Sequence, residues 1–169
     1  SWSLHVARLM IGGKIQNYRN ILRRYIRDYG ENENINRAVQ VLEHAKREAL
    51  ATQDKTTLIG YEGMASNAYF EVLPVLILNQ KADFPFHGRN RRPPKDAVNA
   101  MLSFAYTLIA NDTSAALETV GLDPYVGFLH TLRPGRTSLA LDMMEELRAY
   151  LGDRFVLSLI NKRQITSKD

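Results

Sequence analysis

The sequence contains no cysteine among its 169 residues. Disulfide bonds, zinc–thiolate sites and a cysteine nucleophile are therefore excluded. It also lacks a long apolar run: the best stretch, Val72 to Leu78, is interrupted by Pro74. That stretch is far shorter than the ~20 residues needed to cross a bilayer. No signal-peptide pattern is present at the start, so we expect a cytoplasmic protein without a membrane partner.

The excess of positive charge is small, with 22 Lys and Arg against 18 Asp and Glu and a net charge of +4. Such a balance permits a nucleic-acid partner and does not require one. The length suffices for one domain with its own core. Because helical pattern begins within a few residues of Ser1, we expect residues 1–169 to form a single helical domain cut from a longer chain.

Apolar residues recur at helical spacing through most of the chain, and no segment has a strand pattern, so the predicted fold class is all-α. Gly12 and Gly13 are expected to bend or break the first helix, Pro74 to kink or end the third, and Gly152 to stop the sixth. An irregular loop is expected over residues 79–94. The predicted helices span residues 4–29, 34–50, 55 to about 78, 94–110, 113–120, 137 or 138 to 151, and 154–161.

Glu62 lies on a mostly apolar face of the third predicted helix, among small residues that leave room for a ligand or another backbone. A carboxylate is costly to bury unless something pairs with it. A salt-bridged or half-exposed glutamate would also explain this pattern, so Glu62 by itself does not establish a site.

Asp142 and Glu145 are three residues apart and share one face of the sixth predicted helix, whereas Glu146 and Arg148 are interpreted as facing solvent. His130 lies in an apolar stretch, where a hydrogen-bonded core histidine is common. Each residue therefore has a structural explanation. Taken together, one imidazole and several carboxylates form a donor set for Mn²⁺ or Mg²⁺. Such an ion polarises phosphoryl oxygens.

Basic residues cluster at two places near these candidates. Arginine matches phosphate with two parallel hydrogen bonds, which favours contacts to DNA. The predicted DNA-binding residues are Arg89, Arg91, Arg92 and Lys95 next to the start of the fourth helix, and Arg133 and Arg136 after His130. A polar stripe beside them, formed by Asn99, Ser103 and Tyr106, is consistent either with support of the site or with a hydrogen-bond network in the core.

Several of these motifs, in this order, resemble the Cas1 family of CRISPR-associated integrases and endonucleases. The resemblance rests on residues 60–63 (GYEG) with Tyr69-Phe70, residues 89–103 (RNRRPPKDAVNAMLS), residues 121–130 (GLDPYVGFLH), residues 133–136 (RPGR) and residues 138–148 (SLALDMMEELR). It covers most of the chain. The variant is similar to the one found in type I systems of subtype C.

The resemblance implies a multi-helix catalytic domain with metal ligands at Glu62, His130 and Glu145. Asp142 would be a helper or an alternative ligand in the same catalytic site. It further implies Mn²⁺ or Mg²⁺ as cofactor, a homodimer, assembly with Cas2 and in some systems Cas4, and double-stranded DNA as substrate. In this family the 3′-hydroxyl of a short foreign DNA attacks a phosphodiester at the boundary of a CRISPR repeat.

The sequence also departs from the family, because no segment matches its N-terminal β-rich domain. We therefore expect that domain to be absent here. Two other functions stay open. One is a non-catalytic helical DNA-binding or scaffold module of the same complex, in which the acidic residues are structural. The other is a helical hydrolase for a small phosphorylated substrate, although the arginine-rich loops favour a longer polyanion.

Overall fold

A computed structural model describes residues 1–90 and 92–168, and over these residues the secondary structure is helical without a strand. The predicted all-α class is therefore confirmed. In chain order the helices are α1 (Trp2–Tyr29), α2 (Glu33–Ala51), α3 (Lys55–Leu76), α4 (Ala97–Thr119), α5 (Ser138–Leu147), the π-helix η1 (Arg148–Asp153) and α6 (Arg154–Asn161).

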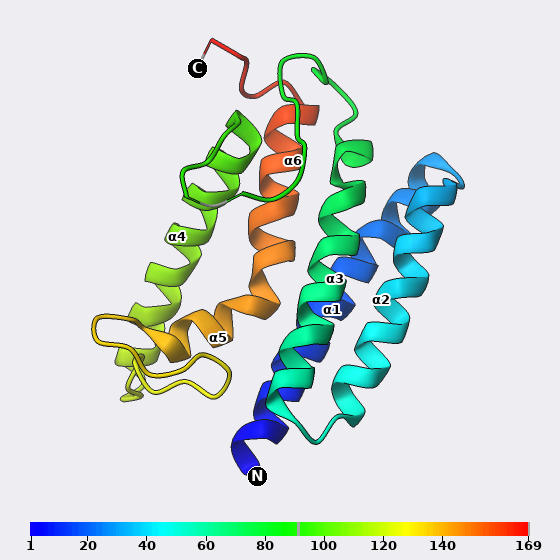
Figure 1. Ribbon diagram of the computed structural model, residues 1–169. Helices are drawn as coiled ribbons and strands as arrows, with labels where there is room; N and C mark the ends of the chain where they lie inside the picture. Colours follow the sequence, from blue (N-terminus) through cyan, green and yellow to red (C-terminus); the bar gives the residue numbers. More distant parts are fainter. Residues whose placement is uncertain (91, 169) are drawn as a thin grey trace.

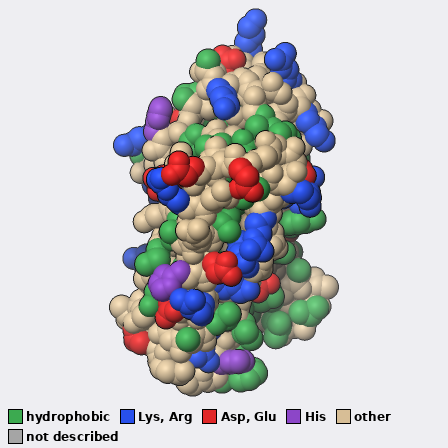
Figure 2. Space-filling view, turned by 90° about the vertical axis from the view of Figure 1, so that its right-hand side faces the viewer, with side chains coloured by type: hydrophobic (Ala, Val, Ile, Leu, Met, Phe, Trp, Pro, Cys, Tyr) green, Lys and Arg blue, Asp and Glu red, His purple; other side chains and the backbone are tan. Residues whose placement is uncertain are grey.

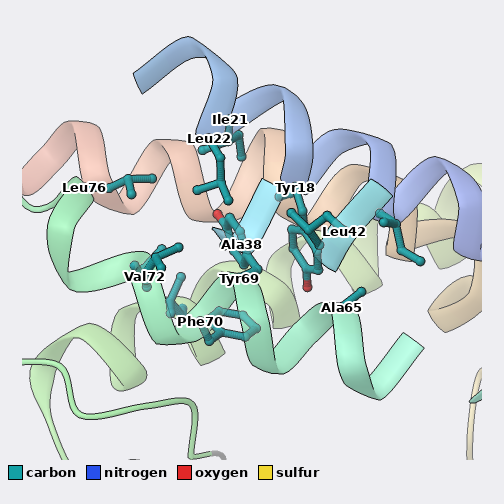
Figure 3. Close-up of a cluster of buried hydrophobic side chains, with 14 of the residues drawn as sticks. Tyr18, Ile21, Leu22, Ala38, Leu42, Ala65, Tyr69, Phe70, Val72 and Leu76 are labelled. Carbon is teal, nitrogen blue, oxygen red and sulfur yellow. The ribbon is translucent and has the colours of Figure 1, made fainter. Parts of the chain in front are cut away.

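The long helices α1, α2 and α3 pack side by side and form one half of the molecule (Figure 1). Their shared core is aromatic: the Tyr18 ring of α1 stacks on the Tyr69 ring of α3 with centroids 4.0 Å apart, and Phe70 meets Tyr18 edge-on. Figure 3 shows these rings among aliphatic side chains such as Leu22 and Leu42. Offset aromatic pairs of this kind contribute about 0.5–1.5 kcal/mol beyond the area that they bury.

The other half consists of α4, α5, η1 and α6, and α1 contacts both halves because it also packs against α5 and η1 (Figure 1). Two long irregular segments lead into and out of α4: residues 77–90 and 92–96 before it, and residues 120–137 after it. This arrangement brings residues from α1, α3 and α5 together at the junction of the two halves.

The first three helices lie close to their predicted bounds, and the predicted break at Gly12-Gly13 was wrong. α1 continues through Gly12 and Gly13 without a break. These glycines permit close approach of neighbouring segments instead, since a Cβ atom would lie 2.9 Å from Leu50 at Gly12 and 2.7 Å from Glu146 at Gly13. α3 ends at Leu76, two residues after Pro74 and within the stretch where Pro74 was expected to kink or end the helix.

The second half differs more from the predictions. The two helices predicted over 94–110 and 113–120 are one helix, α4, which starts at Ala97 because the Asp96 side chain caps the amide of Asn99. Gly152 does not stop the sixth predicted helix. The chain passes through it as the π-helix η1 and continues as α6, with Gly152 close against the Tyr106 ring.

Among the described residues, no helix is both long and apolar enough to cross a membrane. Figure 2 shows the face on the right-hand side of Figure 1, where acidic and basic side chains are interspersed with apolar ones. This face therefore has no extended area of one sign of charge.

Candidate active site

Lys14 of α1 lies between two carboxylates that come from different helices. Its ammonium contacts Oε1 of Glu62 on α3, and it is 2.7 Å from Oε2 of Glu145 on α5. The Ser66 hydroxyl donates a second hydrogen bond to Glu62 Oε1, at 3.0 Å. Arg148 contacts the other oxygen of Glu145 at 2.9 Å. Two acidic residues 83 positions apart thus converge on one buried cation.

Burial and charge act in opposite directions on these groups. Burial alone would lower the pKa of Lys14, but Tyr18 and the carboxylates of Glu145 and Glu62 reverse this and raise that pKa above its usual value. Burial alone would raise the pKa of Glu145, but Lys14 and Arg148, with a smaller contribution from His130, lower it below the usual value. Lys14 therefore stays charged and Glu145 stays ionised at neutral pH.

Asp142 holds the loop that carries His130. Its buried carboxylate accepts the backbone N–H groups of Phe128 (2.6 Å), Leu129 (2.8 Å) and His130 (3.0 Å), and it also binds Nδ1 of the His130 ring. Since a carboxylate only accepts, the proton of the imidazole belongs on Nδ1 and the lone pair on Nε2. Gly127 lets this loop approach, because a Cβ atom there would lie 2.7 Å from Asp142 Oδ2.

His130 and Glu145 line one open cavity of about 710 Å³, together with a set of arginines. The arginines come from three segments of the chain: Arg92 before α4, Arg133 and Arg136 after His130, and Arg148 of η1. Polyanions are attracted to such a concentration of guanidinium groups. The cavity thus combines an imidazole and an ionised carboxylate with several guanidinium groups.

Arg89, in contrast, turns its guanidinium into the protein. It donates to Oδ1 of Asn99 at 2.8 Å and to the Ser103 hydroxyl at 3.0 Å, and it lies over the Tyr106 ring. The Tyr106 hydroxyl in turn donates to Asp153. The polar stripe of α4 is therefore part of a buried hydrogen-bond network that fixes the loop before α4 against the rest of the fold.

A protein-family comparison matches residues 1–169 to the model of the CRISPR associated protein Cas1. The chain belongs to the Cas1 family. Cas1 relatives from two bacteria are 50% identical over 167 residues (Chlorobaculum tepidum) and 46% identical over 169 residues (Leptospira interrogans), covering 97% and 98% of this chain. Both are named CRISPR-associated endonuclease Cas1.

The chain spans 49% and 66% of the length of those two Cas1 relatives. A relative from Geobacter sulfurreducens, 41% identical over 170 residues, is named a Cas4 exonuclease and Cas1 endonuclease fusion; the match covers 98% of this chain and 30% of the fusion.

Solved structures show the same helical fold. A partial Cas6-RT-Cas1–Cas2 complex contains a chain that matches with a TM-score of 0.88 and 28% identity, over 99% of this chain and 48% of the other. A casposase bound to an integration product matches with a TM-score of 0.79 and 28% identity, over 99% of this chain and 45% of the other. The helical catalytic domain of Cas1 proteins is thus the fold of this chain.

Within this Cas1 fold, the residues singled out from the sequence fall into three groups. Glu62 and Glu145 meet at Lys14, Asp142 and His130 form a pair, and Arg92, Arg133 and Arg136 line the cavity. Lys95 is exposed, and Arg91 lies outside the described residues. Sequence reasoning missed Lys14 and wrongly placed Arg148 in solvent, although a lysine between Ile11 and Ile15 on an apolar helix face was a signal.

Among the described residues, no three His, Asp or Glu side chains lie close enough together to hold a metal ion as they stand. The donor chemistry nevertheless fits Mn²⁺ or Mg²⁺, because Glu62 and Glu145 already share one cation and His130 borders the same cavity as Glu145. Asp142 does not fit as a ligand, since its oxygens are occupied by three backbone amides and the His130 ring.

Proposed function

We propose that this chain is the catalytic domain of a metal-dependent DNA endonuclease and integrase that inserts short foreign DNA into a CRISPR array. The observation that carries the proposal is that Glu62 and Glu145 both contact the buried Lys14 ammonium, beside His130 and an arginine-lined cavity. Two relatives are named endonucleases, and one similar structure is named a casposase bound to an integration product. Both names support the same chemistry.

Glu62, His130 and Glu145 would hold Mn²⁺ or Mg²⁺, which when bound stabilises negative charge on the phosphoryl group and the leaving oxygen. Asp142 keeps the His130 ring oriented, as carboxylates commonly do for metal-binding histidines. Arg133 and Arg136 are exposed enough to reach the phosphates that flank the reacting one.

The reaction is a transesterification. The 3′-hydroxyl oxygen of the incoming DNA forms a bond to phosphorus while the bond to the leaving 3′-oxygen of the repeat breaks, and the proton of the attacking hydroxyl passes to that leaving oxygen through the surroundings. One phosphodiester is made for each one broken, so no nucleotide cofactor is needed. Hydrolysis by the same site would use water as the nucleophile, which explains endonuclease activity.

The partners follow from the same assignment. We infer double-stranded DNA, as prespacer and CRISPR repeat, a homodimer, and assembly with Cas2 and in some systems Cas4. A Cas1–Cas2 complex among the similar structures and a Cas4–Cas1 fusion among the relatives support the last two. Of the other predicted DNA contacts, Arg89, Arg91 and Lys95 stay predictions, as does assignment to type I systems of subtype C.

The test is strand transfer of a short duplex into a CRISPR repeat by the full-length protein, in the presence and absence of Mn²⁺. We expect Glu62→Ala, His130→Ala and Glu145→Ala each to abolish metal-dependent strand transfer while DNA binding in a gel-shift assay persists. Glu146→Ala is the matched control, because Glu146 is an exposed carboxylate next to Glu145 on α5.

One observation favours the alternative of a non-catalytic DNA-binding or scaffold module. Lys14 and Arg148 neutralise Glu62 and Glu145, and buried ion pairs of this kind also occur where charged residues are only structural. If the three alanine variants kept full strand transfer, or if the wild-type protein showed none with any divalent ion, the scaffold reading would replace the integrase proposal.

A further inference from the structure

Lys14 is a buried charged residue to which the proposed reaction gives no role. It projects from the middle of α1 beside Ile11, Ile15 and Tyr18, and it is 1% exposed. A buried charge costs free energy unless it is paired. Its only ion-pair partners among the described residues are Glu62 and Glu145, the two carboxylates expected to hold the divalent ion.

The charges of this cluster balance without a metal. Lys14 and Arg148 carry two positive charges, and Glu62 and Glu145 carry two negative ones. Lys14 contacts both carboxylates, and Arg148 contacts Glu145. A divalent ion added between the same carboxylates would face the Lys14 ammonium at a separation of a few ångströms. Repulsion at that distance is strong in a largely buried site, so the ammonium and the ion compete for one position.

Tyr18 offers the ammonium a second position. It follows Lys14 by four residues on the same face of α1, and the Lys14 ammonium is 5.8 Å from the centroid of its ring. Among the described residues the Tyr18 hydroxyl is a buried polar atom without a hydrogen-bond partner. The lysine side chain has four rotatable bonds, so its ammonium can turn from the carboxylates towards this oxygen.

We propose that Lys14 occupies the metal position between Glu62 and Glu145 in the metal-free protein, and that its ammonium turns towards the Tyr18 hydroxyl when a divalent ion binds. The inference rests on the proposed function, because it needs Glu62 and Glu145 to be metal ligands. Lys14 is then a positioning residue. It keeps the two carboxylates together before the ion arrives, and it sets the concentration at which the ion enters.

The experiment is calorimetric titration of Mn²⁺ into the chelator-treated chain, with thermal unfolding measured in parallel. We expect Lys14→Met to bind Mn²⁺ about tenfold more tightly, because one positive charge no longer competes with the ion. The same variant should melt at a lower temperature in chelator and gain more from Mn²⁺ than the wild type gains. Lys46→Met is the matched control, since Lys46 on α2 pairs with Gln16 instead of a carboxylate.

Tyr18→Phe tests the second position separately. We expect its melting temperature in chelator to equal that of the wild type, because no protein group among the described residues forms a hydrogen bond with the hydroxyl. Its Mn²⁺ affinity should fall about threefold, because the displaced ammonium then lacks an acceptor.

The outcomes separate this inference from the proposed function. If the wild type binds Mn²⁺ and Glu62→Gln abolishes that binding, the metal site stands; Lys14→Met affinity equal to or below wild type would then overturn the Lys14 inference alone. If neither the wild type nor Lys14→Met binds Mn²⁺, both proposals fail. Should Lys14→Met not fold, Lys14→Gln replaces it, and unchanged Mn²⁺ affinity in Tyr18→Phe would also contradict the proposed movement.

Discussion

Asp142 holds the loop that carries His130, so replacement of its carboxylate by an amide should weaken both the fold and the orientation of the imidazole. One oxygen accepts the amides of Phe128 and Leu129, and the other accepts the amide and the ring Nδ1 of His130. In Asp142→Asn the NH₂ group must replace one of these oxygens. With the NH₂ group at the Oδ2 position, the amides of Phe128 and Leu129 lose their acceptor. With it at the Oδ1 position, the His130 amide loses its acceptor, and the ring keeps a hydrogen bond only by moving its proton from Nδ1 to Nε2.

An unsatisfied buried donor costs about 1–3 kcal/mol, so the loss of one or two acceptors should lower the free energy of unfolding by about 1–6 kcal/mol. At its upper end that is a large fraction of the 5–15 kcal/mol, roughly, that stabilises a typical domain. Urea unfolding of Asp142→Asn at neutral pH measures the loss. Glu146→Gln makes the same chemical change at an exposed position of the same helix and should alter stability by less than about 0.5 kcal/mol.

Nitrogen NMR of the histidine rings gives a second measurement. In the wild type the Asp142 carboxylate favours the proton on Nδ1 of His130, whereas in Asp142→Asn this preference should be lost. A loss of stability no larger than that of Glu146→Gln, with an unchanged His130 spectrum, would refute the role assigned to Asp142.

Three further predictions concern the pH response, the loop and the cavity. Burial, only partly offset by the hydrogen bond from Tyr106, raises the pKa of Asp153 from 3.8 to about 6. The protonated Asp153 carboxyl therefore stabilises the folded protein. This contribution is complete below the pKa of the unfolded chain, 3.8, and is lost as the pH rises through the pKa of the folded protein, about 6. Urea unfolding should therefore show the wild type losing about 3 kcal/mol relative to Asp153→Asn between pH 4 and pH 7; parallel pH profiles of the two proteins would contradict this. Gly127→Ala should lower the free energy of unfolding by about 1–3 kcal/mol, because the new Cβ atom meets Asp142 and the Ser138 backbone. Gly60→Ala should not lower the free energy of unfolding, because no neighbouring atom lies within 4 Å of the new Cβ. Equal losses of stability in the two variants would contradict the close contact assigned to Gly127. Arg133→Ala and Arg136→Ala should each weaken DNA binding and reduce the slope of log affinity against log salt by about 1 in a fluorescence titration. Arg37→Ala, whose side chain pairs with Glu33 on α2, should leave that slope unchanged, and a slope unchanged in all three would exclude phosphate contacts at the cavity.

Helix bounds were predictable where the signal is local. Asn32 and Asp54 cap α2 and α3 through their own side chains, and the apolar stripes behind them have helical spacing. The breaks expected at Gly12-Gly13, near residue 111 and at Gly152 did not occur. Glycine is unfavourable in an isolated helix, but here the close contacts at Gly12 and Gly152 compensate by packing against Leu50 and the Tyr106 ring. Those contacts join segments remote in sequence, so no local pattern predicts them.

The sequence by itself determined the all-α class and the family, because these depend on residue types and on their order along the chain. Only the tertiary structure decided how the residues of the candidate site are paired. Lys14, Glu62 and Glu145 belong to three different helices, and their contact exists only because α3 and α5 both pack against α1. Asp142 and Glu145 share a helix face in sequence, yet one binds a loop and the other faces a cation. The energy of a buried charge depends on what surrounds it in space, and that information is absent from spacing along the chain.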